Sequence, residues 1–444
     1  MKQEIQLSDH FTYRKLLRFT VPSIAMMIFT SVYGVVDGFF VSNFVGKTPF
    51  AAVNFVMPFL MILGGTGFMF GTGGSALVSK TMGEGDTDRA NRIFSLITYV
   101  CLGAGCVVSV LGMILIRPVA AALGAEGEML NLCVLYGRIL LLGNPAFTLQ
   151  TYFQSFFVTA QKPKLGLYVT VAAGVANMVL DALFVGLFQW GIVGAAVATI
   201  VGQFIGGIFP LVYFARPNSS LLRLTRTQFC GTALIKTCTN GSSELLNNIS
   251  MSLVGMLYNV QLMKYAGENG VAAYGVLMYV CLIFIGAFIG YSVGTAPIVG
   301  FHYGAKNHTE LRNVLRKSLV IIGSFSVSML LLGEVLATPL SEIFVGYDQT
   351  LLSITQSGFV LFSFSFLFAG IGIYGSGFFT ALNNGLISAL VSFLRTMVFQ
   401  VVSILVLPLF FDVNGIWISL VVAEALAAAV TVCFMVGLRK KYRY

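Results

Sequence analysis

The segment Gly174-Val175-Ala176-Asn177-Met178-Val179-Leu180-Asp181-Ala182-Leu183-Phe184 is apolar except for an amide and a carboxylate four residues apart. In a helix this spacing places Asn177 and Asp181 on one face. An ionised aspartate within hydrocarbon costs roughly 2.5 to 3.5 kcal/mol or more on insertion scales, so Asp181 should face protein or a water-filled cavity. The segment therefore predicts a membrane-spanning helix that carries a functional polar face.

The composition of the whole chain is that of an integral membrane protein. Of its 444 residues 57% are hydrophobic and 10% are charged, whereas soluble domains carry about 25% charged residues. Windows of about 20 apolar residues predict twelve spanning helices, at roughly 16–43, 50–78, 93–116, 129–159, 165–186, 191–214, 234–263, 271–299, 317–337, 351–381, 386–408 and 414–437. The predicted fold class is all-α integral membrane.

The basic residues predict the orientation of these helices. With the N-terminus in the cytoplasm, the inner segments hold 21 Lys and Arg residues, and the outer loops hold only Lys47, Arg117 and Lys264. Because basic residues concentrate on the cytoplasmic side, we expect both termini to be cytoplasmic, in a multi-pass protein of the inner (cytoplasmic) membrane. The net charge of +9 then follows from topology, and we expect no nucleic-acid partner.

The chain also repeats at an offset of 221 residues. Val45–Ala52 aligns with Ala266–Ala273, and the same offset relates Gly83 to Gly304. An even number of helices per repeat implies two six-helix bundles related by a pseudo-two-fold axis along the membrane normal. The predicted parts are an N-terminal bundle (1–215), a cytoplasmic linker (216–232) and a C-terminal bundle (233–444).

Counting along the helices brings polar residues of the N-terminal half to one depth. Asp37 with Tyr33 one turn before it, Asp181 with Asn177, and Thr199 should all lie in the outer half of the bilayer. Carboxylate, amide and hydroxyl oxygens suit a hard cation, so Asp37, Asn177, Asp181 and Thr199 could hold Na⁺. Two carboxylates in one pocket also repel each other, so a proton could use the same site. The alternative is that each acid has its own packing partner.

The second half does not copy this site, because the two aspartates fall opposite Tyr258 and Val402. It has its own candidate at the start of the seventh helix, where Glu244 is followed by Asn247 and Asn248. These residues could form a C-terminal proton or substrate site. An acid stabilised by the helix N-terminus is the alternative.

Two further charged residues lie at matching depth in the last two helices. Arg395 and Glu424 should form a structural ion pair. Arg138 could instead neutralise an acid of the N-terminal half. His302, after the eighth helix, is expected to be an exposed interfacial residue. The seven cysteines show neither disulfide nor metal spacing.

Taken together, these motifs resemble the multidrug and toxic compound extrusion (MATE) family over essentially the whole chain. The features that carry the resemblance are Pro22 with Tyr33-x-x-x-Asp37, Lys80-x-x-Gly83-x-Gly85, its echo at Tyr303-Gly304-Ala305-Lys306, and Asn177-x-x-x-Asp181 with Thr199. The resemblance implies a V-shaped antiporter that exports cationic and amphiphilic compounds against an inward flow of Na⁺ or H⁺.

The resemblance also implies roles for individual positions. Asp37, Asn177, Asp181 and Thr199 match the N-lobe cation site of the family, with Tyr33 alongside. Glu244 matches an acid that some branches use in the C-lobe, but the tenth helix here, at 371–375, lacks the acid that can accompany it.

The functional hypothesis is therefore a multidrug efflux antiporter with the lipid bilayer and small organic cations or amphiphiles as its partners. We expect it to be monomeric, to need no cofactor beyond the coupling ion and to catalyse no chemical reaction. The alternative is a lipid-linked oligosaccharide flippase of the same superfamily. The predicted spans contain more acids than arginines, which favours a cationic cargo. The acids are Asp37, Asp181, Glu244, Glu334 and Glu424, and the arginines are Arg138 and Arg395.

Overall fold

The computed structural model describes residues 5–346 and 348–444, and these residues form helices without any β-strand. The first half comprises α1 (Tyr13–Phe44), α2 (Lys47–Gly83), α3 (Thr87–Ala122), α4 (Gly127–Thr159), α5 (Pro163–Asp181), the π-helical segment η1 (Ala182–Leu187) and α6 (Gly191–Ala215). The second half comprises α7 (Gly231–Gly304), α8 (His308–Val345), α9 (Gln349–Ser363), α10 (Phe366–Ala381), α11 (Gly385–Phe393), the π-helical segment η2 (Leu394–Val398), α12 (Phe399–Val406) and α13 (Pro408–Tyr442).

The described helices form twelve membrane spans, because α7 contains two spans and several shorter helices join end to end into single spans. The 74 residues of α7 would extend about 110 Å as one helix, far beyond a bilayer of about 30 Å. Gly267, with φ 62° and ψ −154°, breaks α7 into two spans. Helices α9 and α10 form one span bent by 50°, and α11, η2 and α12 follow one another as another. The predicted fold class is confirmed, although the expected loop at 264–270 is only a break at Gly267.

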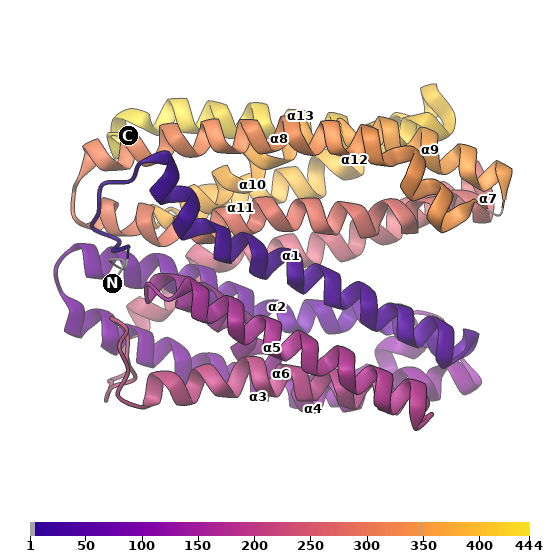
Figure 1. The fold of residues 1–444 in the computed structure, drawn as a ribbon, viewed down its shortest axis with the longest axis horizontal. Coiled ribbons are helices and arrows are strands. Elements are labelled where there is room, and N and C mark those ends of the chain that lie inside the picture. The colour runs from indigo at the N-terminus through magenta and orange to yellow at the C-terminus, as the bar shows by residue number, and fades with distance from the viewer. Residues whose placement is uncertain (1–4, 347) are drawn as a thin grey trace.

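The two halves lie side by side, and both chain termini lie at one end of the molecule (Figure 1). We call this end the terminal end. There the backbones of α2 and α7 meet, because a Cβ atom on Gly83 would collide with the carbonyl oxygen of Phe301, and one on Gly304 with that of Lys80. The 221-residue offset relates Gly83 to Gly304 and Lys80 to Phe301, so each contact is the repeat equivalent of the other. The halves therefore pack with the symmetry that the repeat predicts.

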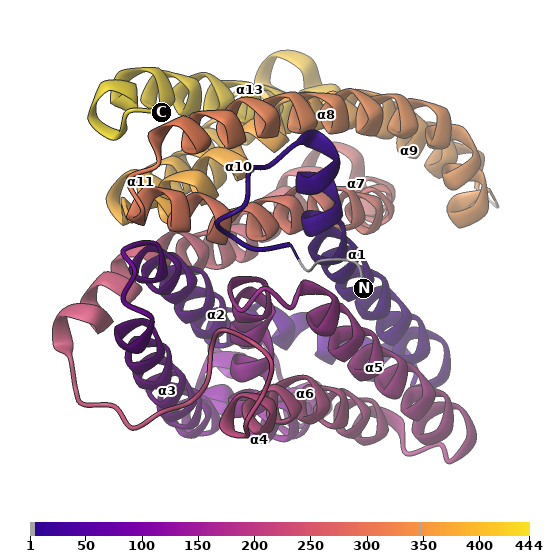
Figure 2. The same cartoon turned by 60° about the vertical axis from the view of Figure 1, so that its left-hand side comes forward.

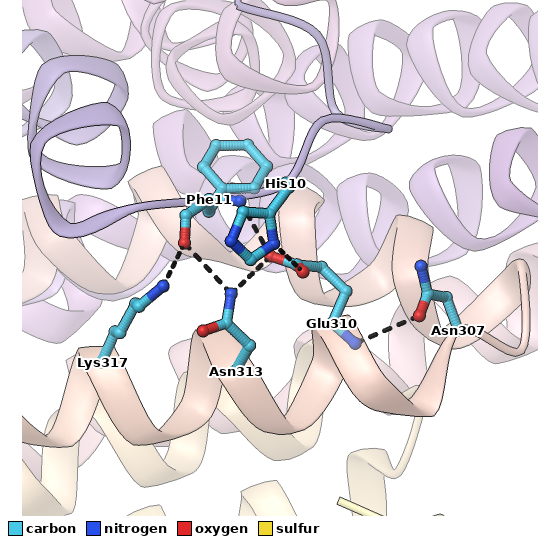
Figure 3. Close-up of polar contacts among 6 residues, drawn as sticks. All are labelled: His10, Phe11, Asn307, Glu310, Asn313 and Lys317. Carbon is cyan, nitrogen blue, oxygen red and sulfur yellow. Dashed lines mark hydrogen bonds and ion pairs between the residues drawn. The ribbon is translucent and has the colours of Figure 1, made fainter.

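The residues before α1 reach across to the second half and bind α8 (Figure 3). We call residues 5–12 the N-terminal strap. The backbone N–H of Phe11 donates to Glu310 Oε1 at 2.8 Å, and His10 Nδ1 lies 2.7 Å from Glu310 Oε2. The Phe11 carbonyl accepts from Asn313 Nδ2 at 3.0 Å and from Lys317 Nζ at 2.6 Å. With the Phe11 side chain fully buried, the strap is anchored by both apolar and polar contacts.

The linker before α7 likewise contacts the other half of the protein, where it binds α3. We call residues 221–230 the linker strap. Its backbone N–H groups at Arg223 and Thr225 donate to Asn91 Oδ1 at 2.9 Å and to Ser95 Oγ at 2.8 Å. Thr227 Oγ1 donates to the carbonyl of Arg92 at 2.8 Å. Each half is therefore preceded by a non-helical segment that binds the third span of the other half.

Candidate functional site

Asp37 and Thr199 bring helices α1 and α6 together in the first half. Thr199 Oγ1 lies 3.4 Å from Asp37 Oδ1 and 3.0 Å from the carbonyl oxygen of Ala195. A hydroxyl group has one proton, so Thr199 donates to only one of these acceptors at a time. When it donates to Ala195, its lone pairs remain free to bind a cation beside Asp37.

Asp181 and Asn177 supply the second part of this site from α5. Both side chains are buried, with Asp181 0% exposed, and the Asp181 carboxyl interacts electrostatically with that of Asp37. Asp181 and Asn177 both face the Asp37 carboxyl group, but within the described residues neither side chain makes a hydrogen bond of ordinary geometry. Buried polar groups without partners cost free energy, so this cluster is poised to gain stability from a proton or a cation.

The local backbone changes at Asp181. It is the last residue of α5, and the chain continues directly into η1. Single turns of π-helix occur frequently at functional sites, because the extra residue per turn turns side chains away from their regular helical direction.

Tyr33 lies one turn before Asp37 and packs on α5 at Gly174. A Cβ atom on Gly174 would lie 2.9 Å from Tyr33 Cδ1, closer than van der Waals contact allows. The absence of a side chain at Gly174 therefore lets α1 approach α5. This close approach places Asp37 beside Asp181.

Tyr136 in α4 is a member of the cluster that sequence reasoning missed. Its side chain is fully buried, and it interacts electrostatically with both Asp37 and Asp181. Its hydroxyl has no hydrogen-bond partner within the described part of the chain. Its depth in the membrane could have revealed it from the sequence. Tyr136 lies nine residues after the start of α4, and Thr199 lies eight residues after the start of α6.

The second half has no acid at the position equivalent to Asp37. Tyr258, opposite Asp37 in the repeat, shares a hydrogen bond of 2.8 Å with Ser419 Oγ. This pair contains no charge and satisfies its own polar groups. The acid cluster is thus restricted to the first half.

Arg395 and Glu424 form a buried ion pair in the second half. Arg395 Nε donates to Glu424 Oε2 at 2.8 Å and to Oε1 at 3.1 Å. Arg395 lies in η2, so π-helical segments adjoin charged residues in both halves. Glu244 also interacts electrostatically with Arg395, a connection that the sequence did not suggest.

Asn247 and Asn248 follow Glu244 at the contact between the two halves. Asn248 Nδ2 donates to the carbonyl of Glu244 at 2.9 Å, and its Cβ atom lies 3.6 Å from the Cβ position at Gly65 in α2. The Oδ1 atom of Asn247 is buried without a partner among the described residues. These amides therefore offer polar groups where the first half packs against the second.

Two expectations about single residues are settled by burial. His302 is 2% exposed and contacts Phe11 edge to face at a centroid distance of 6.4 Å, so the prediction of an exposed residue is wrong. The N-terminal strap covers it, which the sequence of α7 alone does not reveal. Arg138 is exposed and forms no ion pair within the described residues, so it does not neutralise Asp37 or Asp181 in this structure.

No group of three His, Cys, Asp or Glu side chains within residues 5–346 and 348–444 could hold a metal ion. A Na⁺ ion at the first-half site would therefore depend on the Asn177 and Thr199 oxygens as well as on the two carboxylates. This donor set consists of oxygen atoms alone, which fits a hard monovalent cation better than a transition metal.

The MatE family model matches the chain twice, at residues 22–183 and at residues 245–406. The chain belongs to the MatE family. The two matched ranges are equally long and cover most of both halves, in agreement with the internal repeat. As a MatE protein it is a multi-pass membrane transporter and not an enzyme.

Curated relatives and solved structures resemble this MatE chain along its whole length. It is 23% identical over 433 residues to the multidrug export protein MepA of Staphylococcus saprophyticus, covering 96% of this chain and 92% of that protein. It is 23% identical over 442 residues to MepA of Staphylococcus aureus strain MRSA252, covering 97% and 94%. The outward-facing structure of a multidrug resistance MATE family transporter of the MOP superfamily is 21% identical, with a TM-score of 0.93 and coverage of 100% and 99%.

Proposed function

We propose that this protein is a secondary active antiporter that exports small organic cations or amphiphiles in exchange for Na⁺ or H⁺. The observation that carries the proposal is the cluster of Asp37, Asn177, Asp181 and Thr199, in which Asp181 and Asn177 are buried beside Asp37 and make no hydrogen bond of ordinary geometry within the described residues. The names of the MepA relatives, multidrug export proteins, support the class of cargo.

The coupling ion acts by binding one conformation more tightly than the other, since a ligand shifts an equilibrium only by its differential affinity. Helix α1 is placed to transmit this difference. Near Tyr33 it packs on α5 of the first half, and near Ile24 it packs on α7, where a Cβ atom on Gly290 would lie 2.5 Å from Ile24 Cα. A cation or proton that relieves repulsion between Asp37 and Asp181 changes the α1–α5 contact and thereby the contact between halves.

The terminal end faces the cytoplasm in this proposal. The two straps and the ends of α2, α3, α7 and α8 meet there, and nearly all basic residues outside the spans belong to the segments predicted to be inner. The backbone contacts at Gly83 and Gly304 then close the cytoplasmic side. Export requires these contacts to separate and re-form in each cycle.

The flippase alternative is less well supported by the charges. A pyrophosphate-linked cargo requires unpaired cationic groups between the membrane-spanning helices, and the buried Arg395 already forms an ion pair with Glu424. Asp37, Asp181 and Glu244 add negative charge to the interior. A cationic cargo meets favourable electrostatics, whereas a pyrophosphate meets repulsion.

Proteoliposomes loaded with a fluorescent cationic dye test the proposal. We expect either a Na⁺ or a proton gradient to drive dye transport by the wild type, and Asp37→Asn and Asp181→Asn each to reduce the rate at least about tenfold, because each removes a charge that the ion requires. Glu342→Gln, an exposed acid outside the cluster, is the matched control and should keep wild-type transport. Equal rates for the aspartate variants and the wild type would refute the ion site, and no transport under either gradient would refute antiport.

A further inference from the structure

A cavity of about 390 Å³ lies between α3, the linker strap and the start of α7. Figure 2 shows the linker passing α3 on its way from α6 to α7. The cationic side chains Arg89 and Arg92 of α3 and Lys236 of α7 line the cavity. None of the three pairs with a carboxylate in the described part of the chain, so the cavity gathers three uncompensated positive charges.

The repeat provides an internal comparison for these charges. Under the 221-residue offset Arg89 corresponds to Glu310, and Arg92 corresponds to Asn313. The helix starts are equivalent as well, since Asp86 accepts from the backbone N–H of Arg89 at 2.9 Å, as Asn307 does from that of Glu310 at 3.1 Å. The N-terminal strap therefore binds a carboxylate and an amide where the linker strap faces two guanidinium groups.

The third cation differs from its counterpart in the same way. Lys236 corresponds to Lys15, which pairs with Asp9 at 2.8 Å. The position equivalent to Asp9 is Cys230, so Lys236 has no acid in the strap beside it. Charges are compensated within the protein at one strap and left uncompensated at the other.

The steric comparison agrees with the electrostatic one. The N-terminal strap fills its contact with the fully buried ring of Phe11. The corresponding residue in the second half is Thr232, which is exposed and lines the cavity. Replacement of a large ring by a small polar side chain leaves room for a ligand at the cationic position.

The surroundings of the cavity are those of a membrane interface. Arg92, Tyr99 and Cys106 are spaced by seven residues, lie on one face of α3 and are all exposed. This face leads from the cavity along the apolar span of α3. Phe229 beside the cavity is 81% exposed, and Ile235 next to Lys236 is 66% exposed, so apolar groups and cations alternate at the rim.

We propose that this cavity is a binding site for the phosphate headgroup of an anionic phospholipid in the leaflet at the terminal end. The guanidinium groups of Arg89 and Arg92 bind phosphate oxygens in forked geometry, and an acyl chain follows the exposed face of α3. Lys236 belongs to the second half, so one phosphate links the two halves. The lipid thereby stabilises the packed arrangement at this end, independently of the transported cargo.

Native mass spectrometry of the purified full chain in a neutral detergent tests this site. We expect the wild type to retain one phosphatidylglycerol molecule in preference to phosphatidylcholine. The triple variant Arg89→Gln, Arg92→Gln, Lys236→Gln should bind phosphatidylglycerol at least about tenfold more weakly, because each basic residue near an anionic lipid contributes measurably to binding. The matched control Arg312→Gln, Arg316→Gln, Lys440→Gln removes three exposed cations from the same end and should leave binding unchanged.

Two further arms complete the test. Phosphatidylglycerol should raise the melting temperature of the wild type and of the control but not of Lys236→Gln alone, since binding to the folded state alone stabilises it. Unchanged lipid binding by the cavity variant, or an equal loss in the control, would overturn the proposal. Displacement of the lipid by millimolar inorganic phosphate would assign the site to a free anion and overturn the lipid assignment. Size-exclusion profiles establish that each variant is folded. Dye transport by the wild type is measured separately, so that failure of the antiport proposal is distinguished from failure of the lipid proposal.

Discussion

Gly83 of α2 and Gly304 of α7 occupy equivalent positions in the two halves, and each lies against a backbone carbonyl of the opposite half, at Phe301 and Lys80 respectively. Neither position has room for a methyl group. The contact between halves at the terminal end therefore depends on two residues that the repeat relates.

Substitution of either glycine by alanine should destabilise this packed arrangement. Gly→Ala in an exposed helix interior normally stabilises by up to about 1 kcal/mol, but collision with a fixed backbone oxygen reverses the sign and costs about 1–3 kcal/mol. We expect Gly83→Ala and Gly304→Ala to lower the melting temperature and to slow dye transport to a similar degree. Gly323→Ala, which meets no atom within 4 Å, is the control and should not lower it. A higher melting temperature for all three variants would contradict the predicted collision at Gly83 and Gly304.

The hydroxyl of Thr199 beside Asp37 should contribute to binding of the coupling ion. Thr199→Val keeps the shape but removes a group worth about 1 kcal/mol, so the ion concentration for half-maximal transport should rise about fivefold. Thr199→Ser restores the hydroxyl and should restore transport. If valine and serine behave alike, the hydroxyl has no part in ion binding.

The Arg395–Glu424 pair should show strong energetic coupling. Breaking a buried ion pair by removing one partner typically costs about 3–5 kcal/mol, whereas replacement of both by apolar groups of similar size costs much less. We expect Arg395→Met and Glu424→Leu each to lower the melting temperature more than the double variant does. Additive decreases in the double variant would show that the two residues act separately.

The N-terminal strap should depend on the buried ring of Phe11. Truncation of a buried phenylalanine typically costs about 3–5 kcal/mol, so Phe11→Ala should release the strap and accelerate hydrogen exchange at residues 7–11 by at least about tenfold. Tyr168→Ala, which removes an exposed aromatic ring from α5, is the control. Unchanged exchange in Phe11→Ala would mean that the contacts of Glu310, Asn313 and Lys317 hold the strap alone.

Much of the fold could be predicted because hydrocarbon restricts the choices. Apolar windows located the spans, and the offset from Gly83 to Gly304 located the symmetry. The boundaries were less predictable where geometry departs from a regular helix. Gly267 carries the reversal between two spans in one residue, and the tenth predicted span bends between Ser363 and Phe366.

The candidate site was only partly predictable. Asp37, Asn177, Asp181 and Thr199 could be grouped by depth, because helical rise converts residue number into height. Depth does not specify rotation about the helix axis or the neighbour of each face. For that reason Tyr136 was missed, and the interaction of Glu244 with Arg395 was not foreseen.

The sequence by itself determined the twelve spans, the two-fold repeat and the set of acids that hydrocarbon makes costly, since each follows from local hydropathy and spacing. Tertiary structure alone decided that Gly174 lets Tyr33 approach α5, and that His302 lies buried beneath Phe11. It also decided that three cations line a cavity beside the linker strap, whereas the N-terminal strap binds Glu310 of α8 and buries Phe11 at the equivalent place. These features depend on contacts between residues far apart in the chain, and such contacts form only when the helices pack.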